Sequence, residues 1–135
     1  MSKYDIIERA TNFSRDFEVE SFRKKDQLDA ILDKTIEFLH EEIRETKDAL
    51  AINDKPEIID GFGDVAFIAL NGIYKAFCVH GDDHDVAMEK VTEVMKRICE
   101  ANLGKKQSDG TIKYVNGKVQ KPESWSPPEY QDLLG

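Results

Sequence analysis

Apolar side chains recur at every third or fourth position along most of the chain, which is the spacing of one face of an α-helix. The pattern is clearest over residues 26–50, where no Gly or Pro interrupts it. Turn-forming residues separate this stretch from three others with the same spacing. We therefore predict four helices: residues 4–22 with an end near Lys24, residues 26–50, a helix from the Asn53–Pro56 break to about Val79, and a helix from the Gly81–Asp83 break to about Leu103.

The character of the sequence changes after Gly104, where the helical spacing ends. Two turn-forming pairs, Asp109-Gly110 and Asn116-Gly117, flank a short run, and prolines follow. This pattern predicts an extended or hairpin-like tail over residues 104–135. Together the elements predict an all-α fold, a four- to five-helix bundle over residues 4–103 that carries this tail within a single domain of residues 1–135.

The composition agrees with one globular domain, since 40% of the 135 residues are hydrophobic and 34% are charged. No apolar run approaches the roughly 18 residues that a membrane span requires, so we expect a soluble protein without a membrane partner. The acidic residues near the N-terminus do not fit a signal peptide, and we expect a cytoplasmic location. Cys78 and Cys99 fall in apolar helical patterns without a CxxC motif, which predicts buried, reduced thiols.

The formal net charge is −8, whereas nonspecific binding of nucleic acid depends on Lys and Arg. The sequence therefore argues against a nucleic-acid partner. A polyanionic ligand would need local exceptions to this charge, and the chain has two. One is a cluster of carboxylates that could hold cations, and the other is the lysine-bearing tail.

Two neighbouring predicted helices each carry a stripe of acidic side chains. On the second helix, Glu41 and Glu45 lie one turn apart with Glu42 alongside. On the third helix, three acids fall within an arc of roughly 60°: Glu57, Asp60 and Asp64. The short connection favours antiparallel packing, which would bring the stripes together, and close like charges destabilise a fold unless a cation compensates. Because oxygen-only ligands select hard ions, we expect Mg²⁺, with Mn²⁺ as a substitute.

The same acids are also compatible with a solvated helix face, the ordinary role of charges on a helix. Two features of the third helix favour a site instead. Asp60 and Asp64 adjoin an almost continuous apolar run, residues 65–70, where a merely solvated acid would be out of place. Gly61 and Gly63 each cost a helix interior up to about 1 kcal/mol relative to Ala, which indicates close approach of backbone or ligand, or a break in the helix.

Two competing metal sites have some support from the spacing of histidines. Glu37 and His40 fit the Glu-x-x-His spacing of di-iron bundles, but those bundles need the motif on two helices, and the acids of the third helix have no histidine three residues later. We expect His40 to pack or to support a neighbouring ligand. His80 and His84 straddle a predicted helix break, which disfavours a zinc site.

The acidic motifs resemble those of the all-α nucleoside triphosphate pyrophosphohydrolases, which include MazG-like proteins, dimeric dUTPases and phosphoribosyl-ATP pyrophosphohydrolase. Members carry EExxE on one helix, matched here by Glu41, Glu42 and Glu45. On the next helix they carry an acidic pair that ends in Asp before an apolar stretch, matched by Asp64 and residues 65–68. The resemblance covers most of the chain.

The chain departs from the family's pattern in the second motif, which is usually ExxD. Gly61 stands three positions before Asp64, and the nearest acids are Asp60 at four positions and Glu57 at seven. Either of these two acids would complete the second motif.

The tail carries a more specific resemblance, to the C-terminal signature of one MazG-like branch. The matching segments are Asn102–Lys105, Asp109-Gly110, Asn116–Pro122 and Trp125–Pro128. By this resemblance, the branch includes enzymes that act on deoxynucleotides such as dUTP, and Asn102 and Lys105 would reach the substrate. Lys118 and Lys121 would take further phosphate charge. The alternative for these lysines is a solvated tail.

The resemblance implies a metal-dependent hydrolase that converts a (d)NTP and water into a (d)NMP and pyrophosphate, in nucleotide-pool house-cleaning or as a dUTPase-like enzyme. We expect the ligands of Mg²⁺ to be drawn from Glu41, Glu42, Glu45, Asp60 and Asp64, with Glu57 as a further candidate. Glu41 and Glu45 are the expected catalytic acids, with Glu41 a candidate base. Family members of this size form their sites within a homodimer or homotetramer, which the resemblance implies here.

Recognition of the base is not specified by any motif. Four side chains could stack on or hydrogen-bond a base but fit a core role equally well: Asn12, Phe13, Phe17 and Trp125. An alternative of another class also stands. The chain would then be a non-catalytic helical interaction module that has kept the family's fold, and the altered second motif favours it.

Overall fold

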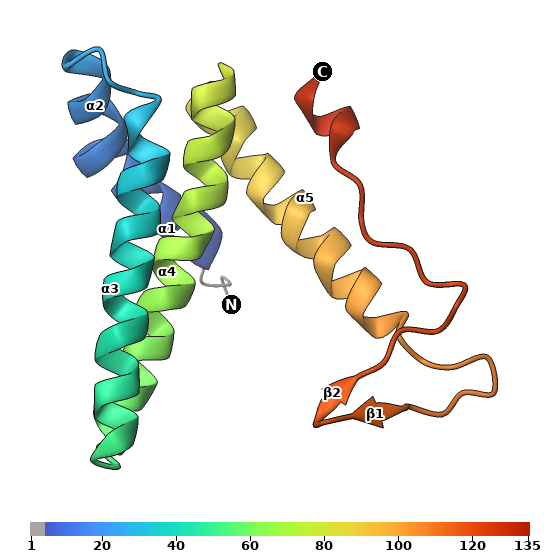
Figure 1. Ribbon diagram of the computed structural model, residues 1–135. Coiled ribbons are helices and arrows are strands. Elements are labelled where there is room, and N and C mark those ends of the chain that lie inside the picture. The colour runs from blue at the N-terminus through green and yellow to red at the C-terminus, as the bar shows by residue number, and fades with distance from the viewer. Residues whose placement is uncertain (1–4) are drawn as a thin grey trace. The chain divides into compact units, whose positions relative to one another are not determined.

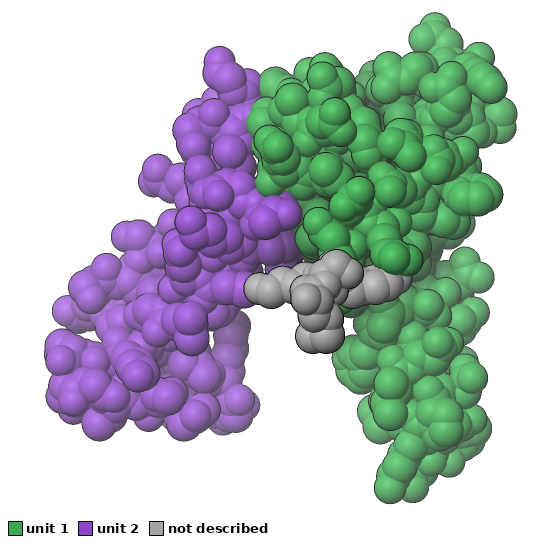
Figure 2. Space-filling view, turned by 180° about the vertical axis from the view of Figure 1, so that it is seen from behind, with its two compact units in different colours: residues 1–91 green, residues 92–135 purple. Residues whose placement is uncertain are grey.

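The computed structural model describes residues 5–135, and the chain forms two compact units, Met1–Val91 and Thr92–Gly135 (Figure 2). The boundary lies inside a continuous helix, α5 (His84–Leu103), and not at residue 103, where we predicted the helical core to end. The fold is all-α with a short hairpin in the tail, as predicted (Figure 1). The organisation as a single domain stays a prediction.

The helices of the first unit begin and end close to the predicted positions. They are α1 (Ile6–Ser14), the π-helix η1 (Arg15–Val19), α2 (Glu20–Lys24), α3 (Ala30–Ala51), α4 (Lys55–His80) and the beginning of α5. Residue 4, at which we predicted the first helix to begin, lies outside the described residues. Helix α3 begins at Ala30 and not at residue 26, because Asp26 adopts a left-handed conformation with φ of 55° in the turn after α2.

Capping residues explain the bounds of α4. A side-chain oxygen of Asp54 accepts a hydrogen bond from the backbone N of Glu57 at 3.3 Å, and Pro56 occupies the first turn, where its missing N–H costs nothing. At the other end, Gly81 adopts a φ of 118°, which glycine tolerates without strain. Both predicted breaks, before α4 and after it, are confirmed.

Helices α3 and α4 are antiparallel neighbours with the most extensive contact in the first unit (Figure 1). Toward one end of the pair, Nζ of Lys75 donates to Oγ1 of Thr35 at 3.1 Å. Toward the other end, the backbone of Gly61 lies directly against the side chain of Thr46. The packing that the sequence favoured for these helices is therefore present, and it brings their acidic stripes face to face.

The segment between α1 and α2 is the π-helix η1, which the apolar spacing did not predict. A π-helix widens the turn and so rotates the side chains that it carries relative to a continuous α-helix. Glu18 lies in this segment, accepts a hydrogen bond from Oγ of Ser14 at 3.1 Å and pairs with Nζ of Lys75 at 2.9 Å. The π-helix thus places a carboxylate against the buried face of α4.

The second unit contains the rest of α5, a hairpin of β1 (Tyr114–Val115) and β2 (Lys118–Val119), and the 3₁₀ helix η2 (Gln131–Leu134). Asn116 and Gly117 form the turn between the strands, with φ of 51° and 76°, as the turn-forming pair predicted. The guanidinium of Arg97 on α5 binds both carboxylate oxygens of Asp132 at 2.7 and 2.8 Å. This bidentate pair raises the pKa of Arg97 and lowers that of Asp132.

Cys78 is buried as predicted, but Cys99 is exposed, because it lies outside the buried stripe of α5 that contains Val91 and Val94. Both thiols are free.

By length and composition, α4 is the one helix in the described part of the chain that could cross a membrane. It also carries the buried ammonium of Lys75 and several carboxylates, which are costly in hydrocarbon. Solubility and a cytoplasmic location stay predictions.

Candidate functional site

The facing surfaces of α3 and α4 are built from residues three or four positions apart, so that each helix presents one stripe to the other. On α3 the stripe is Thr35, Phe38, Glu42 and Thr46 with Glu45 beside it. On α4 it is Glu57, Gly61, Asp64, Ile68, Asn71 and Lys75, with Asp60 and Phe67 beside it. Near the α3–α4 connection the side chains of both stripes are mostly acidic. Toward the opposite end, the stripes carry aromatic rings, the amide of Asn71 and the ammonium of Lys75.

The acidic part of the two stripes encloses a small hollow of about 30 Å³. Seven residues line it: Glu42, Glu45, Thr46, Glu57, Asp60, Gly61 and Asp64. Five of these carry carboxylates, and all five were predicted site residues. Both candidates for the second acidic motif, Glu57 and Asp60, therefore lie at the hollow together with Asp64.

Gly61 is the point of closest approach between the two helices at the hollow. A Cβ atom built on Gly61 would overlap Oγ1 of Thr46 and lie 3.0 Å from its Cβ. The Oγ1 atom is itself held by a 2.7 Å hydrogen bond to the carbonyl oxygen of Glu42. With Thr46 held in this position, the two helices leave no room for a side chain at position 61. Gly63, by contrast, faces open space, so the expectation of close approach is confirmed at Gly61 only.

Electrostatic repulsion is concentrated on Glu42. Partial burial raises the pKa of Glu42, and the negative charges of four neighbours raise it further: Glu45, Asp64, Glu41 and Asp60. Glu42 is thus the carboxylate of the hollow whose charged form is disfavoured by its surroundings. A cation at the hollow would remove this penalty.

The donor set of the hollow fits Mg²⁺ or Mn²⁺, because carboxylate oxygens are the ligands that hard divalent ions prefer. The residues that would hold an ion are Glu42, Glu45, Asp60 and Asp64, with Glu57 at the same hollow. Within residues 5–135, no three His, Cys, Asp or Glu side chains are already arranged closely enough to form a metal-binding group. The predicted metal ligation stays a prediction.

Glu41 is the one predicted acid that does not line the hollow. Its side chain is exposed on α3, and its recorded influence is through charge, as one of the neighbours that raise the pKa of Glu42. Its predicted role as a base stays a prediction. A position within the EExxE motif is therefore not sufficient to place a side chain on the surface of α3 that faces α4.

A second and larger cavity, of about 290 Å³, continues from the hollow along the same two helices. It is lined by Phe13, Glu18, Phe38, Glu42, Asp64, Phe67, Ile68, Asn71 and Lys75. Glu42 and Asp64 belong to the walls of both spaces. Carboxylates therefore occupy one end of a cavity whose sides are aromatic.

The opposite end of this cavity carries polar groups that the sequence reasoning missed. Lys75 is 2% exposed, and its Nζ contacts Oε2 of Glu18 at 2.9 Å and Oγ1 of Thr35 at 3.1 Å. Asn71, one turn earlier on α4, is 1% exposed and donates from Nδ2 to the carbonyl oxygen of Phe67 at 3.2 Å. The sequence did contain a signal for these groups, namely a Lys and an Asn within the apolar pattern of residues 65–78. Such polar residues are rarely buried unless they are paired or hydrogen-bonded.

The four residues considered for base recognition have separate environments. Phe13 lines the aromatic cavity, stacks on Phe17 with ring centroids 5.0 Å apart and meets Phe67 edge to face at 5.3 Å. Oδ1 of Asn12 lies 3.1 Å from Nε2 of His84. Trp125 lies in the second unit, where its Nε1 donates to the carbonyl oxygen of Ala101 at 2.7 Å.

The histidines do not assemble the competing metal sites. His84 is engaged through both ring nitrogens, by Asn12 and by the hydroxyl of Tyr74 at 2.8 Å. His40 and His80 are exposed. Burial raises the pKa of the Tyr74 hydroxyl.

The predicted substrate-binding residues of the tail lie in the second unit. Nζ of Lys105 contacts Oδ1 of Asn102 at 2.7 Å and lies 5.5 Å from the centre of the Trp125 ring. Nζ of Lys121 lies 4.6 Å from the same ring centre, so two ammonium groups share one indole. Lys118 is exposed on β2. Two of the four thus lie at the Trp125 ring and Asn102 contacts one of these two, and the contact of all four with a substrate stays a prediction.

Comparisons with protein-family models, with curated proteins and with solved structures found no match to this chain.

Proposed function

We propose that this chain is a divalent-metal-dependent nucleoside triphosphate pyrophosphohydrolase. The observation that carries the proposal is the position of Glu42 and Asp64, which line both the acidic hollow and the aromatic cavity. One ligand could therefore place a charged, metal-bound group at the carboxylates and an aromatic group between the phenylalanine rings. A nucleoside triphosphate combines these two parts in one molecule.

Different residues of the chain would bind the metal ions and accept the proton. Glu42, Glu45, Asp60 and Asp64 would hold the ions, and bound Mg²⁺ would neutralise the triphosphate and lower the pKa of the attacking water. Glu45 and Glu41 remain the candidates for receiving the proton of that water. Water adds to the nucleotide as pyrophosphate leaves, so the products are a nucleoside monophosphate and pyrophosphate.

Pyrophosphate release tests the proposal. The protein would be incubated with a panel of ribo- and deoxynucleoside triphosphates, with Mg²⁺, with Mn²⁺ and with a chelator. We expect release from one or a few nucleotides that requires the metal and is lost in Glu45→Gln and Asp64→Asn. Asp48→Asn, an exposed acid on α3 outside the hollow, is the matched control and keeps full turnover. No release from any nucleotide by folded protein would contradict the proposal.

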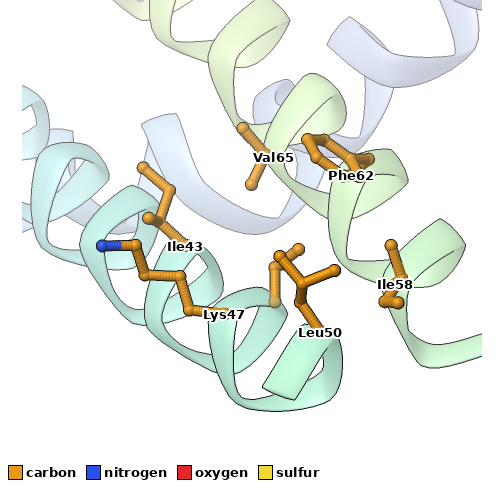
Figure 3. A pocket seen from close by; sticks show the side chains of 7 residues that line it. Ile43, Lys47, Leu50, Ile58, Phe62 and Val65 are labelled. Carbon is orange, nitrogen blue, oxygen red and sulfur yellow. The ribbon is translucent and has the colours of Figure 1, made fainter. Parts of the chain in front are cut away.

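A second candidate function is that of a helical interaction module, and an apolar groove on the same two helices favours it (Figure 3). The groove has a volume of about 180 Å³ and is lined by Ile43, Thr46, Lys47, Leu50, Ile58, Phe62 and Val65. Leu50 and Phe62 are 63% and 66% exposed, which is unusual for side chains of this size. The homodimer or homotetramer that we predict would also use such a surface.

Two measurements separate the candidates. Light scattering at micromolar concentration gives the mass in solution, and a monomer would contradict the predicted oligomer. Isothermal titration with Mg²⁺ reports whether the acidic hollow binds metal. An interaction module without catalysis would show neither nucleotide turnover nor a difference in Mg²⁺ binding between wild type and Asp64→Asn.

A further inference from the structure

The ring of Phe13 on α1 forms one wall of the aromatic cavity, yet little apolar packing holds α1 in place. Phe13 lines the cavity and meets Phe67 of α4 edge to face at 5.3 Å. The buried side chains of α1 are the small ones of Ala10, Thr11 and Ser14. The larger side chains of Ile6 and Phe13 are exposed, and apolar stabilisation grows with the area that is buried. The position of Phe13 therefore depends on polar contacts as well.

The residue before Phe13 makes a polar contact of this kind. Oδ1 of Asn12 lies 3.1 Å from Nε2 of His84, at the start of α5. An amide oxygen can only accept, so Nε2 of the imidazole donates. The other ring nitrogen, Nδ1, lies 2.8 Å from the hydroxyl of Tyr74 on α4, and a hydroxyl can donate or accept. The imidazole thus bridges α1 and α4.

Tyr74 is a buried attachment point for this imidazole. Its side chain is 1% exposed, and its ring meets the ring of His84 edge to face at 5.6 Å. Tyr74 and Phe67 are seven positions apart, so they lie two turns apart on one face of α4. Helix α1 contacts this face through Phe13 at Phe67 and, by way of His84, through Asn12 at Tyr74.

Phe13 lies between two polar attachments of the segment formed by α1 and η1. Asn12, directly before it, is bound to His84, and Glu18, five positions after it, pairs with Lys75 at 2.9 Å. Glu18 and Lys75 themselves line the cavity, whereas Asn12 and His84 do not. Breaking the contact between Asn12 and His84 would therefore release α1 without removing any group from the cavity.

We propose that Asn12 and His84 are positioning residues, whose hydrogen bond holds α1 against α4 and keeps the Phe13 ring in place as a wall of the aromatic cavity. This inference rests on the proposed function, in which the aromatic group of the substrate binds between the phenylalanine rings. The metal ions and the reacting phosphate are held instead by carboxylates of α3 and α4. The hydrogen bond therefore affects substrate binding and not the chemical step.

Two substitutions of His84 separate its two contacts. Gln has an amide nitrogen at about the distance of Nε2 and can still donate to Asn12, whereas Asn is shorter and reaches only the level of Nδ1. We expect His84→Asn and Asn12→Leu to raise KM for the best triphosphate about 10-fold, the size usual for loss of one base–aromatic stack, with little change in kcat. His84→Gln should keep the KM of wild type. His80→Asn, the same substitution at an exposed histidine of α4, is the matched control and keeps it too.

A second measurement reports the attachment of α1 without any nucleotide. A smaller folded fraction lowers the apparent kcat and leaves KM unchanged, so a rise in KM does not come from unfolding. Hydrogen exchange of the backbone amides of residues 6–14, read by mass spectrometry, shows directly how firmly α1 is held. We expect faster exchange there in His84→Asn and Asn12→Leu, the rate of wild type in His84→Gln, and no change in α3 in any variant.

The outcomes separate the inference from the proposed function. Raised KM and faster exchange of α1 in His84→Asn and Asn12→Leu, with both restored in His84→Gln, support the inference. An unchanged KM in His84→Asn overturns it and leaves the proposed function standing, and so does a His84→Gln variant as deficient as His84→Asn. If wild type hydrolyses no triphosphate, the proposed function fails and the exchange data decide alone. Loss of protection in His84→Asn that His84→Gln restores then supports the role of this hydrogen bond, and equal exchange in all variants overturns it.

Discussion

Nζ of Lys75 lies 2.9 Å from Oε2 of Glu18, so that a lysine with 2% exposure near the C-terminal end of α4 is paired with a carboxylate on η1. The pair closes the inner end of the aromatic cavity. It depends on the π-helix, which carries Glu18, and on Thr35, which takes a second donor of the ammonium.

Removing one partner of the pair should destabilise the protein strongly. Lys75→Met deletes the ammonium and leaves the carboxylate of Glu18, 20% exposed, without its counter-charge. We expect a loss of about 3 kcal/mol in the free energy of unfolding, the lower range for a broken buried pair. Denaturant melts read by circular dichroism measure it. The double variant Glu18→Gln/Lys75→Met removes both charges and should recover at least half of the loss; an equally unstable double variant would show that packing, not charge, is responsible.

The two glycines of α4 near the hollow should respond in opposite directions to the same substitution. Gly61→Ala drives a methyl group into Thr46 and should lower the free energy of unfolding by about 2 kcal/mol, as overpacking does. Gly63→Ala faces open space on a helix and should raise it by up to about 1 kcal/mol. Thermal melts of the two variants give the comparison. Partial rescue of Gly61→Ala by Thr46→Ala is the internal control, and equal effects at both positions would contradict the close approach at Gly61.

The pH dependence of stability should report the repulsion at Glu42. Its pKa is raised above the ordinary value of 4.5 in the folded protein, so the folded state holds this proton more tightly than the unfolded chain. The resulting stabilisation is fully present below about pH 4.5 and is lost as the pH rises through the folded pKa. Glu42→Gln should therefore raise the melting temperature at pH 7 by about 2 °C, as expected for a change of about 0.5 kcal/mol, and the gain should vanish at pH 4. A gain that is the same at both pH values would be inconsistent with charge repulsion.

Divalent metal should stabilise the folded protein through the hollow. At a free concentration 100 times the dissociation constant, Mg²⁺ adds about 2.7 kcal/mol by mass action. We expect the melting temperature to rise with Mg²⁺ in wild type and in Asp48→Asn, to fall back with a chelator, and to respond little in Asp64→Asn. A Mg²⁺ response in Asp64→Asn equal to that of wild type would place the ion elsewhere.

The sequence predicted the parts of the fold that depend on local signals. The bounds of α4 followed from Asp54, Pro56 and Gly81, and the hairpin from Asn116-Gly117, because each has a specific backbone or capping preference. The π-helix carries no such signal, since its apolar spacing over a few residues matches that of an α-helix. Its Glu18 contacts Lys75 on α4, which is distant in sequence.

The candidate site was predicted to a similar extent. Five carboxylates were correctly expected on facing stripes, because helical periodicity determines which side chains share a face. Glu41 was expected on the same stripe, one turn before Glu45, but its side chain is exposed and lies off the hollow. Asn71 and Lys75 were missed, because their importance comes from burial and from unpaired or paired polar atoms, which only tertiary packing creates.

The two free thiols should differ in the rate at which a thiol reagent modifies them. Cys78 is buried in the first unit, and burial raises its pKa, whereas Cys99 is exposed in the second unit. A maleimide reagent should therefore modify Cys99 within its ordinary reaction time and reach Cys78 only when α4 is uncovered by opening of the first unit. Mass spectrometry of the second addition over time would read that opening rate directly, and a ligand seated between α3 and α4 would slow the second addition while leaving the first unchanged.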